Sequence, residues 1–174
     1  AFQDEEPQVV SVSSPTSIEG STQDFVIALD KVSSTSTELS ITVNSGTATV
    51  GVDTSSILVS VNGGSTFVPI GSTTSIPAGV KEVIVRVTTV NDSVVEGSET
   101  YQVVASTSTN VVPVTGVGTI TDGAIPTLSI SGPTDVNEAV GTITYTVTLS
   151  AASAAAVTVN YGTTNGTATA GSDY

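Results

Sequence analysis

The sequence predicts an all-β protein, an antiparallel β-sandwich that begins to repeat along the chain. Val, Ile, Thr and Ser dominate every segment, and β-branched side chains pack well on a pleated sheet. Apolar and polar residues alternate in short runs, which places one face of each run on a core and the other in water. Short motifs recur after about 120 residues, a spacing typical of one domain.

The strands are short and separated by turn residues. The alternation is clearest where Phe25, Ile27 and Leu29 share one face. The Asn-Gly-Gly-Ser cluster at 62–65 predicts a hairpin, because Asn and Gly tolerate positive φ. No segment shows sustained helical periodicity, and 151–156 is expected to form a loop. Seven runs, a number that suits a two-sheet sandwich, are predicted as strands: residues 9–12, 24–29, 39–43, 57–61, 83–89, 100–105 and 116–121.

Two motifs define the repeat. The segment 11–16 matches 129–134, and the Gly-Thr-Ala-Thr motif of 46–53 matches 166–173. Open sheet edges tend to recruit partners, so we expect contact with neighbouring repeats and self-association through the edge of an incomplete repeat. The predicted organisation is a complete sandwich over residues 1–123, a short linker over 124–127, and a partial second repeat over 128–174 that holds only the first strands.

The composition excludes several classes of function. The chain has no Cys, Met, Trp or His, which removes thiolate nucleophiles, imidazole bases and the usual zinc ligands. Three basic residues face 16 acidic ones, a net charge of −13, which disfavours nucleic acid and anionic membrane surfaces. The acidity has a plain alternative explanation in solubility. Without disulfides, rigidity must come from core burial or from a bound ion.

No targeting or membrane segment is evident in the sequence. No run of about 18 apolar residues is present, so we expect no direct membrane insertion. The amino terminus has no basic region followed by an apolar core, the pattern that marks a signal peptide. Export would therefore depend on a signal carried elsewhere in a longer chain.

Acidic residues cluster in the loops between the predicted strands. The densest segment is 91–99, between two strands, and Glu19, Asp53 and Asp122 lie in other loops. Loops after alternate strands of an antiparallel sandwich gather at one end, so these carboxylates can converge. Calcium takes about six to eight oxygen ligands, which short acidic loops can supply. Taken singly, each acid is equally well explained as a solvated loop residue or a turn former.

In chain order, the motifs resemble those of a Calx-beta domain. They are Glu19-Gly20, the 46–53 motif that ends at Asp53, the acidic loop that runs into Tyr101, and the segment 118–122. The resemblance implies a seven-stranded, immunoglobulin-like sandwich with calcium bound in the loops at one end. The positions that match its ligands are Glu19, Asp53, Asp92, Glu96, Glu99 and Asp122, with Glu138 and Asp173 matching in the partial repeat.

The sequence departs from that pattern in ways that reduce the number of acidic ligands at the predicted site. Asn91 stands where a first Asp would complete a pair, and Gly123 and Ala124 follow Asp122 where further acids would continue a run. Fewer charges weaken a calcium site. We therefore expect one or two calcium ions per complete repeat, held at extracellular concentrations, and no complete site in the partial repeat.

Similar repeats act as extender modules of the repeats-in-toxin type in large bacterial surface adhesins. The leading hypothesis is thus a spacer of a secreted or cell-surface adhesin, stiffened by calcium. The alternative is a calcium-dependent module that binds carbohydrate or protein, for which Tyr101 is the only aromatic residue beside the acidic loop. Glycoside hydrolysis needs two acids flanking a cleft, and no aromatic-lined cleft is indicated, so no enzymatic activity is expected.

Overall fold

The computed structural model describes residues 6–92, 96–123, 126–153 and 156–174, without the side chain of Glu138. Its contacts divide the chain into two compact units, Ala1–Gly123 (unit 1) and Ala124–Tyr174 (unit 2). Parts of the predicted linker (124–125), of the acidic loop (93–95) and of the loop at 151–156 (154–155) lie outside the described residues.

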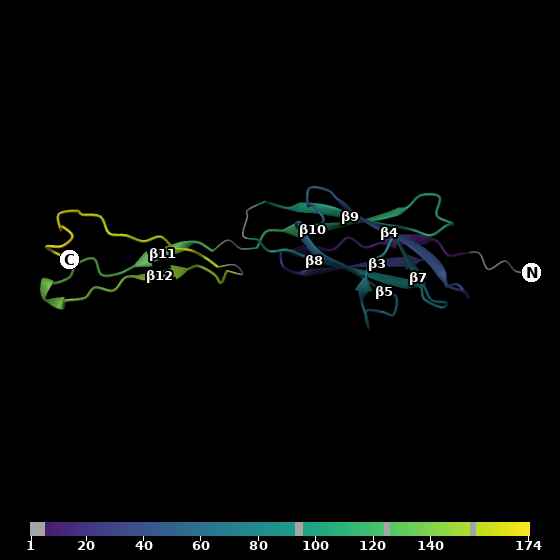
Figure 1. Ribbon diagram of the computed structural model, residues 1–174, viewed down its shortest axis with the longest axis horizontal. Helices are drawn as coiled ribbons and strands as arrows, with labels where there is room; N and C mark the ends of the chain where they lie inside the picture. Colours follow the sequence, from purple (N-terminus) through teal and green to yellow (C-terminus); the bar gives the residue numbers. More distant parts are fainter. Residues whose placement is uncertain (1–5, 93–95, 124–125, 154–155) are drawn as a thin grey trace, which may run out of the picture. The chain divides into compact units, whose positions relative to one another are not determined.

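Unit 1 is a sandwich of two five-stranded sheets (Figure 1), as predicted. Sheet A contains, in spatial order, β1 (Val9–Val12), β3 (Thr22–Leu29), β8 (Glu82–Thr89), β5 (Thr54–Ser60) and β6 (Val68–Pro69). Sheet B contains β2 (Thr16–Ile18), β10 (Val114–Thr121), β9 (Glu99–Ser106), β4 (Thr37–Ser45) and β7 (Thr73–Ile76).

The seven predicted strands correspond to β1, β3, β4, β5, β8, β9 and β10. The predicted hairpin at 62–65 is also confirmed, because β5 pairs with β6 through Leu58–Pro69 and Val59–Val68. Among the described residues, three short strands were not predicted, β2, β6 and β7, so unit 1 has more than seven strands. None exceeds four residues, which is too short for an alternating pattern to be recognised.

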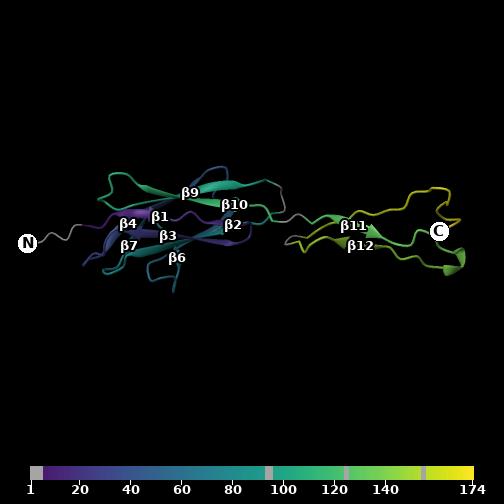
Figure 2. The same ribbon diagram turned by 180° about the vertical axis from the view of Figure 1, so that it is seen from behind.

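One pair of strands departs from the antiparallel arrangement. β2 pairs with β10 in parallel, with Thr16 opposite Thr119 and Ile18 opposite Thr121 (Figure 2). The preceding strand β1 pairs with β3 in the other sheet. The amino-terminal part of the fold is therefore shared between the two sheets, with the change of sheet at residues 13–15.

The core lies between the sheets of unit 1. The predicted alternation is confirmed on β3, where Phe25, Ile27 and Leu29 are at most 1% exposed. Phe25 meets Tyr101 of β9 edge to face, with ring centroids 5.7 Å apart, a favoured aromatic geometry. Burial of an aliphatic or aromatic side chain of this size is worth about 1.5–3 kcal/mol, so this layer holds the sheets together.

Two glycines allow neighbouring groups to approach β10 closely. A Cβ atom at Gly116 would lie 2.3 Å from the carbonyl oxygen of Ser13, and one at Gly118 would lie 2.5 Å from Cζ of Tyr101. Both distances are far below van der Waals contact. Only glycine fits where β10 passes the chain crossing and the Tyr101 ring.

A polar cluster holds a loop over the outer face of sheet A. Arg86 donates two hydrogen bonds of 2.7 Å to the carboxylate of Asp24, and its guanidinium lies 4.0 Å from the ring centroid of Phe67. Gly64 in the same loop adopts a positive φ of 84°, which favours glycine. The loop between β5 and β6 is thus attached to β3 and β8.

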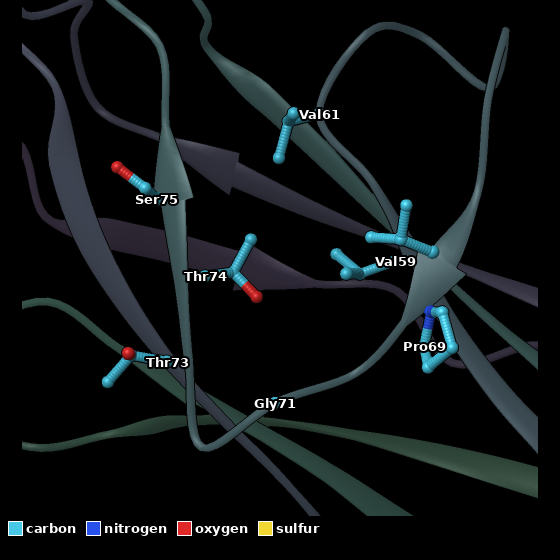
Figure 3. A pocket seen from close by; sticks show the side chains of 8 residues that line it. Val59, Val61, Pro69, Gly71, Thr73, Thr74 and Ser75 are labelled. Carbon is cyan, nitrogen blue, oxygen red and sulfur yellow. The ribbon is translucent and has the colours of Figure 1, made fainter.

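A shallow hollow opens between the edge strands of the two sheets (Figure 3). β6 ends sheet A and β7 ends sheet B on this side. The lining is aliphatic and hydroxylic, without a charged side chain: Val59, Val61, Val68, Pro69, Gly71, Thr73, Thr74 and Ser75.

Unit 2 is a hairpin followed by extended chain. β11 (Leu128–Ser131) pairs antiparallel with β12 (Thr146–Leu149), and a 3₁₀ turn, η1 (Glu138–Val140), lies between them. None of its described residues is buried, and Ile130 and Tyr145 are 69% and 57% exposed. Among the residues described for the whole chain, no helix has the length and apolar character needed to cross a bilayer.

Candidate metal centre

The six carboxylates predicted in the first repeat all lie at one end of unit 1. Glu19 and Asp122 follow the ends of β2 and β10, and Asp92 follows β8, whereas Asp53 and Glu96 precede β5 and β9. Glu99 is the first residue of β9. The strand register brings these ends together, since the end of β8 pairs with the starts of β3 and β5, and the end of β10 pairs with the start of β9.

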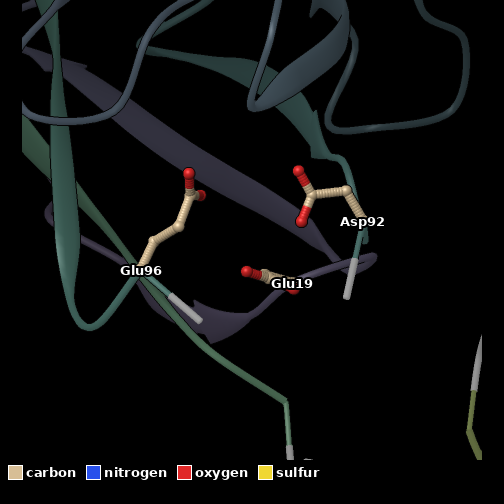
Figure 4. Close-up of side chains that lie close together, drawn as sticks. All are labelled: Glu19, Asp92 and Glu96. Carbon is tan, nitrogen blue, oxygen red and sulfur yellow. The ribbon is translucent and has the colours of Figure 1, made fainter. Parts of the chain in front are cut away.

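Two groups of three carboxylates lie within the reach of one metal ion. One oxygen each from Glu19, Asp92 and Glu96 fall within 4.8 Å of one another, and Figure 4 shows these side chains extending from separate segments into one space. Oxygens of Asp53, Glu96 and Glu99 meet the same limit. Glu96 belongs to both groups, so the two groups form one continuous acidic centre.

Asp122 ties the end of β10 to the acidic loop. Its Oδ2 atom accepts hydrogen bonds from the backbone N–H groups of Glu96 (3.1 Å) and Gly97 (3.0 Å). Its negative charge also contributes, after desolvation, to the raised pKa of Glu19. Asp122 therefore joins the end of β10 to the loop before β9.

A tight turn presents Asp53. Its Oδ2 atom accepts a hydrogen bond of 2.6 Å from the backbone N–H of Thr49, and its own N–H donates to the Thr49 carbonyl at 2.9 Å. Gly51 occupies the left-handed region at φ 91°. The carbonyl of Asp53 accepts a bond of 2.9 Å from Val90 N–H, which joins this turn to the segment that carries Asp92.

The same turn forms in unit 2. Thr169 N–H donates to Oδ2 of Asp173 at 2.7 Å, and Asp173 N–H donates to the Thr169 carbonyl at 3.0 Å. Both acidic groups able to hold an ion, among the described residues, lie in unit 1. Glu138, the other acid predicted there, starts η1, and its side chain is not described.

Negative charge dominates the centre. Desolvation raises the pKa of Glu19, and the charges of Asp122, Asp92 and Glu96 raise it further. Desolvation is also the first cause of the raised pKa values of Glu96 and Glu99, followed by their acidic neighbours, with Asp53 foremost. Among the described residues, no basic side chain contributes to lowering these three pKa values.

The three basic residues of the chain lie elsewhere. Lys31 follows β3 and Lys81 precedes β8, where Leu29 N–H bonds to the Lys81 carbonyl, so both are at the opposite end of unit 1. Arg86 pairs with Asp24. The carboxylates thus repel one another without compensation from a basic side chain.

The donor set fits a hard divalent cation. Carboxylate oxygens are the ligands that Ca²⁺ prefers, and flexible coordination by about six to eight oxygens suits acids gathered from several loops. A bound cation would also offset the repulsion that, after desolvation, contributes to the three raised pKa values. The residues that would hold it are the five grouped carboxylates, with Glu96 shared by both groups, whereas Asp122 belongs to neither group and accepts hydrogen bonds from the acidic loop.

Comparison with models of known protein families shows which family the chain belongs to. The family model of the Calx-beta domain matches residues 3–125 and again 122–174. The chain belongs to the Calx-beta family. The two matches cover both units, so the repeat recognised from the motifs corresponds to two Calx-beta segments.

Solved Calx-beta structures share the fold. The crystal structure of CBD12 from CALX1.2 aligns at 21% identity with a TM-score of 0.50, over 64% of this chain and 44% of that one. The apo form of the Calx CBD1 domain aligns at 21% identity and a TM-score of 0.52, over 68% of this chain and 100% of that one. The chain thus spans less than half of the CBD12 structure. Among curated proteins, the sequence search found no match.

A buried polar layer beneath the Calx-beta carboxylates was not predicted. Gln23 is 2% exposed; it accepts a hydrogen bond from the Tyr101 hydroxyl and donates to the Thr119 carbonyl (2.7 Å) and Ser17 Oγ (3.0 Å). Burial raises the pKa of the Tyr101 phenol. A signal for this layer was present, because the alternation of Phe25, Ile27 and Leu29 extends back to Gln23 and places an amide on the core face.

Thr89 supports the turn that carries Glu19. It is 3% exposed. Its Oγ1 accepts from Ser21 N–H at 3.0 Å and donates to the Ser21 carbonyl at 3.0 Å, and its own N–H donates to that carbonyl at 2.8 Å. Asn91, which stands where an Asp would complete an acidic pair with Asp92, faces the same turn. A Cβ at Gly20 would lie 3.1 Å from Asn91 Cβ.

Proposed function

We propose that unit 1 binds calcium through its grouped carboxylates, with Asp122 holding the acidic loop in place, and that the chain is a spacer segment stiffened by this ion. One observation carries the proposal. Acids from separate loops converge within 4.8 Å of one another in two groups that share Glu96, without a basic residue to offset their charge. Such an arrangement is costly unless a cation binds.

The spacer role is supported by the arrangement of unit 1 and by the repetition. The chain enters unit 1 beside Asn110, because Val9 N–H donates to Asn110 Oδ1, and it leaves beside Glu19 at the other end. A second Calx-beta segment follows. We propose a secreted or cell-surface setting, because calcium is abundant outside cells, and neighbouring repeats as partners, because a second Calx-beta segment is present.

A ligand-binding role is the weaker candidate. A lectin-like site would add an aromatic platform near the metal, and Tyr101 was the residue available for it. Tyr101 is 0% exposed and bonded to Gln23, so it packs the core. The hollow between β6 and β7 lies at the sheet edges and has no charged lining.

Self-association is proposed for unit 2. Ile130 of β11 and Tyr145, just before β12, are exposed, and unpaired edges recruit partners. Light scattering of the whole chain and of residues 1–123 tests this. A larger mass for the whole chain alone supports the proposal, and monomers in both cases contradict it.

Calcium binding is tested by titrating the metal-stripped chain in a calorimeter and by melting it with calcium or chelator. Saturable binding is expected, with a stabilisation of about 2.7 kcal/mol when free calcium is about 100 times Kd. Magnesium should have a weaker effect, because it demands stricter octahedral geometry. Absence of binding heat together with equal melting temperatures in calcium and chelator would refute the proposal.

A further inference from the structure

The two chain ends of unit 1 are attached to strands that tension pulls in opposite directions. β1 begins at the end that holds Asn110, and β10 finishes beside Ile18 at the carboxylate end. Tension along the chain therefore draws Val9 and Thr121 apart, parallel to the strands.

The parallel pairing of β2 with β10 determines how this tension acts. β2 is pulled towards its start and β10 towards its end. In a parallel pair these directions are opposite, so the strands must slide past each other. All hydrogen bonds between them are then loaded together, whereas strands peeled from one end break their bonds one at a time.

Several bonds resist the sliding. Thr119 N–H donates to the Pro15 carbonyl at 3.0 Å, and Glu19 N–H donates to the Thr121 carbonyl at 3.0 Å. A side-chain bond of 3.3 Å joins Thr121 Oγ1 to the Ser17 carbonyl. Gln23, from the opposite sheet, donates to both strands through Thr119 and Ser17.

We propose that the β2–β10 pair is a load-bearing clamp, and that a cation held at the carboxylate centre reinforces it. Glu19 directly follows β2 and lies with Glu96 within reach of one ion, and Asp122, directly after β10, accepts a hydrogen bond of 3.1 Å from Glu96 N–H. An ion bound by Glu19 and Glu96 would therefore link the two strands, through the Glu96 backbone, just beyond their last backbone bond. This reinforcement rests on the proposed calcium function, whereas the clamp rests on strand geometry alone.

Single-molecule pulling of the full chain tests the clamp. The chain has no cysteine, so introduced cysteines are unique handles. Gln8→Cys with Thr127→Cys loads unit 1 from opposite ends. Gln8→Cys with Val111→Cys uses two points at one end, and Val111 is 96% exposed. In chelator, a several-fold higher unfolding force is expected for the first pair. Equal forces in the two geometries would overturn the clamp.

The contribution of Gln23 is tested with Gln23→Leu and Tyr101→Phe combined. Replacing both members of a hydrogen-bonded pair avoids leaving a buried polar group unpaired. The unfolding force between residues 8 and 127 should fall, while Ser56→Ala, which removes a bond to Thr88 outside the load path, should leave it unchanged. If the unfolding force falls equally in the double variant and in Ser56→Ala, Gln23 does not contribute to the clamp.

Pulling experiments with calcium test the reinforcement separately from the clamp. Reinforcement predicts that calcium raises the force for the 8–127 geometry and leaves the 8–111 geometry little changed. An equal rise in both geometries, or none in a chain that binds calcium by calorimetry, overturns the reinforcement. Absence of binding by calorimetry refutes the calcium function instead, and the comparison of the two geometries in chelator still decides the clamp.

Discussion

Glu96 is the residue on which both carboxylate groups depend. Glu96→Gln removes a ligand from each group, so calcium affinity should fall by roughly tenfold or more, a loss of at least about 1.4 kcal/mol. In chelator the same variant should melt no lower than wild type, because it removes a charge from a repulsive cluster. Calorimetric titration and thermal melting measure the two effects.

The control for Glu96→Gln is Glu82→Gln. Glu82 is an exposed acid at the start of β8, at the other end of unit 1. The two variants have the same net charge. If they lower calcium affinity equally, the loss reflects overall charge and not the site.

The raised pKa values of Glu19, Glu96 and Glu99 predict opposite pH effects with and without calcium. Without a cation, ionisation of these groups costs more in the folded state than in the unfolded one, where the pKa is near 4.5. The cost is full above the folded-state pKa and disappears as pH falls below it towards 4.5. Their contribution to stability therefore rises on acidification in chelator.

In calcium, protons compete with the metal for the same oxygens. The stabilisation by calcium should therefore decrease as the pH falls from the folded-state pKa towards 4.5. Melting curves across pH, compared with the triple variant E19Q/E96Q/E99Q, isolate the contribution of the three residues. A stabilisation by calcium that stays constant as pH approaches 4.5 would contradict this prediction.

At the residue scale, sequence position was enough to propose the acids but not their interactions. Asp53 and Asp92 are recognisable because each lies in a loop between two predicted strands. The bonds from Glu96 and Gly97 to Asp122 depend on backbone N–H directions, which side-chain patterns do not encode. The ligand roles of all six residues remain predictions.

At the element scale, the turn that presents Asp53 is encoded locally. The equivalent turn around Asp173 makes the same two bonds to its threonine, although no described residue of unit 2 is buried. The motif therefore fixes its carboxylate without support from a core. This explains why it could be recognised from sequence alone.

Short and parallel strands were the part of the fold that the pattern could not reveal. β2 has three residues and follows Pro15, so it has no visible alternation of its own. Its pairing with β10 joins residues about 100 positions apart and depends on the crossing at 13–15. Tertiary packing selects that partner, and local propensity does not.

The close approach to β10 gives a prediction for Gly116→Ala. The added Cβ would lie 2.3 Å from the Ser13 carbonyl oxygen, so the chain crossing must move, at a cost of about 1–3 kcal/mol or more. Chemical denaturation measures the loss. Gly71→Ala is the control, since its Cβ would meet nothing closer than 3.4 Å, and equal losses in the two variants would rule out the steric explanation.

For the whole molecule, the two units should differ in independent stability. The buried apolar core lies entirely within unit 1, whereas unit 2 has no buried residue among those described. Residues 1–123 should therefore unfold cooperatively with nearly the melting temperature of the whole chain. Residues 124–174 should show no cooperative transition. Calorimetry of both fragments checks this, and a marked loss of stability in residues 1–123 would show that unit 2 supports unit 1.

Because the chain enters and leaves unit 1 at opposite ends, unfolding of this unit under tension would release additional chain length. Strands of eight residues such as β8 rise about 3.3 Å per residue, so the sandwich spans roughly 30 Å along its strands. The same chain, drawn straight from Val9 to Thr121, would reach roughly 370 Å. A sandwich that yields under excessive tension would lengthen its tether roughly tenfold and dissipate energy before any covalent bond is strained.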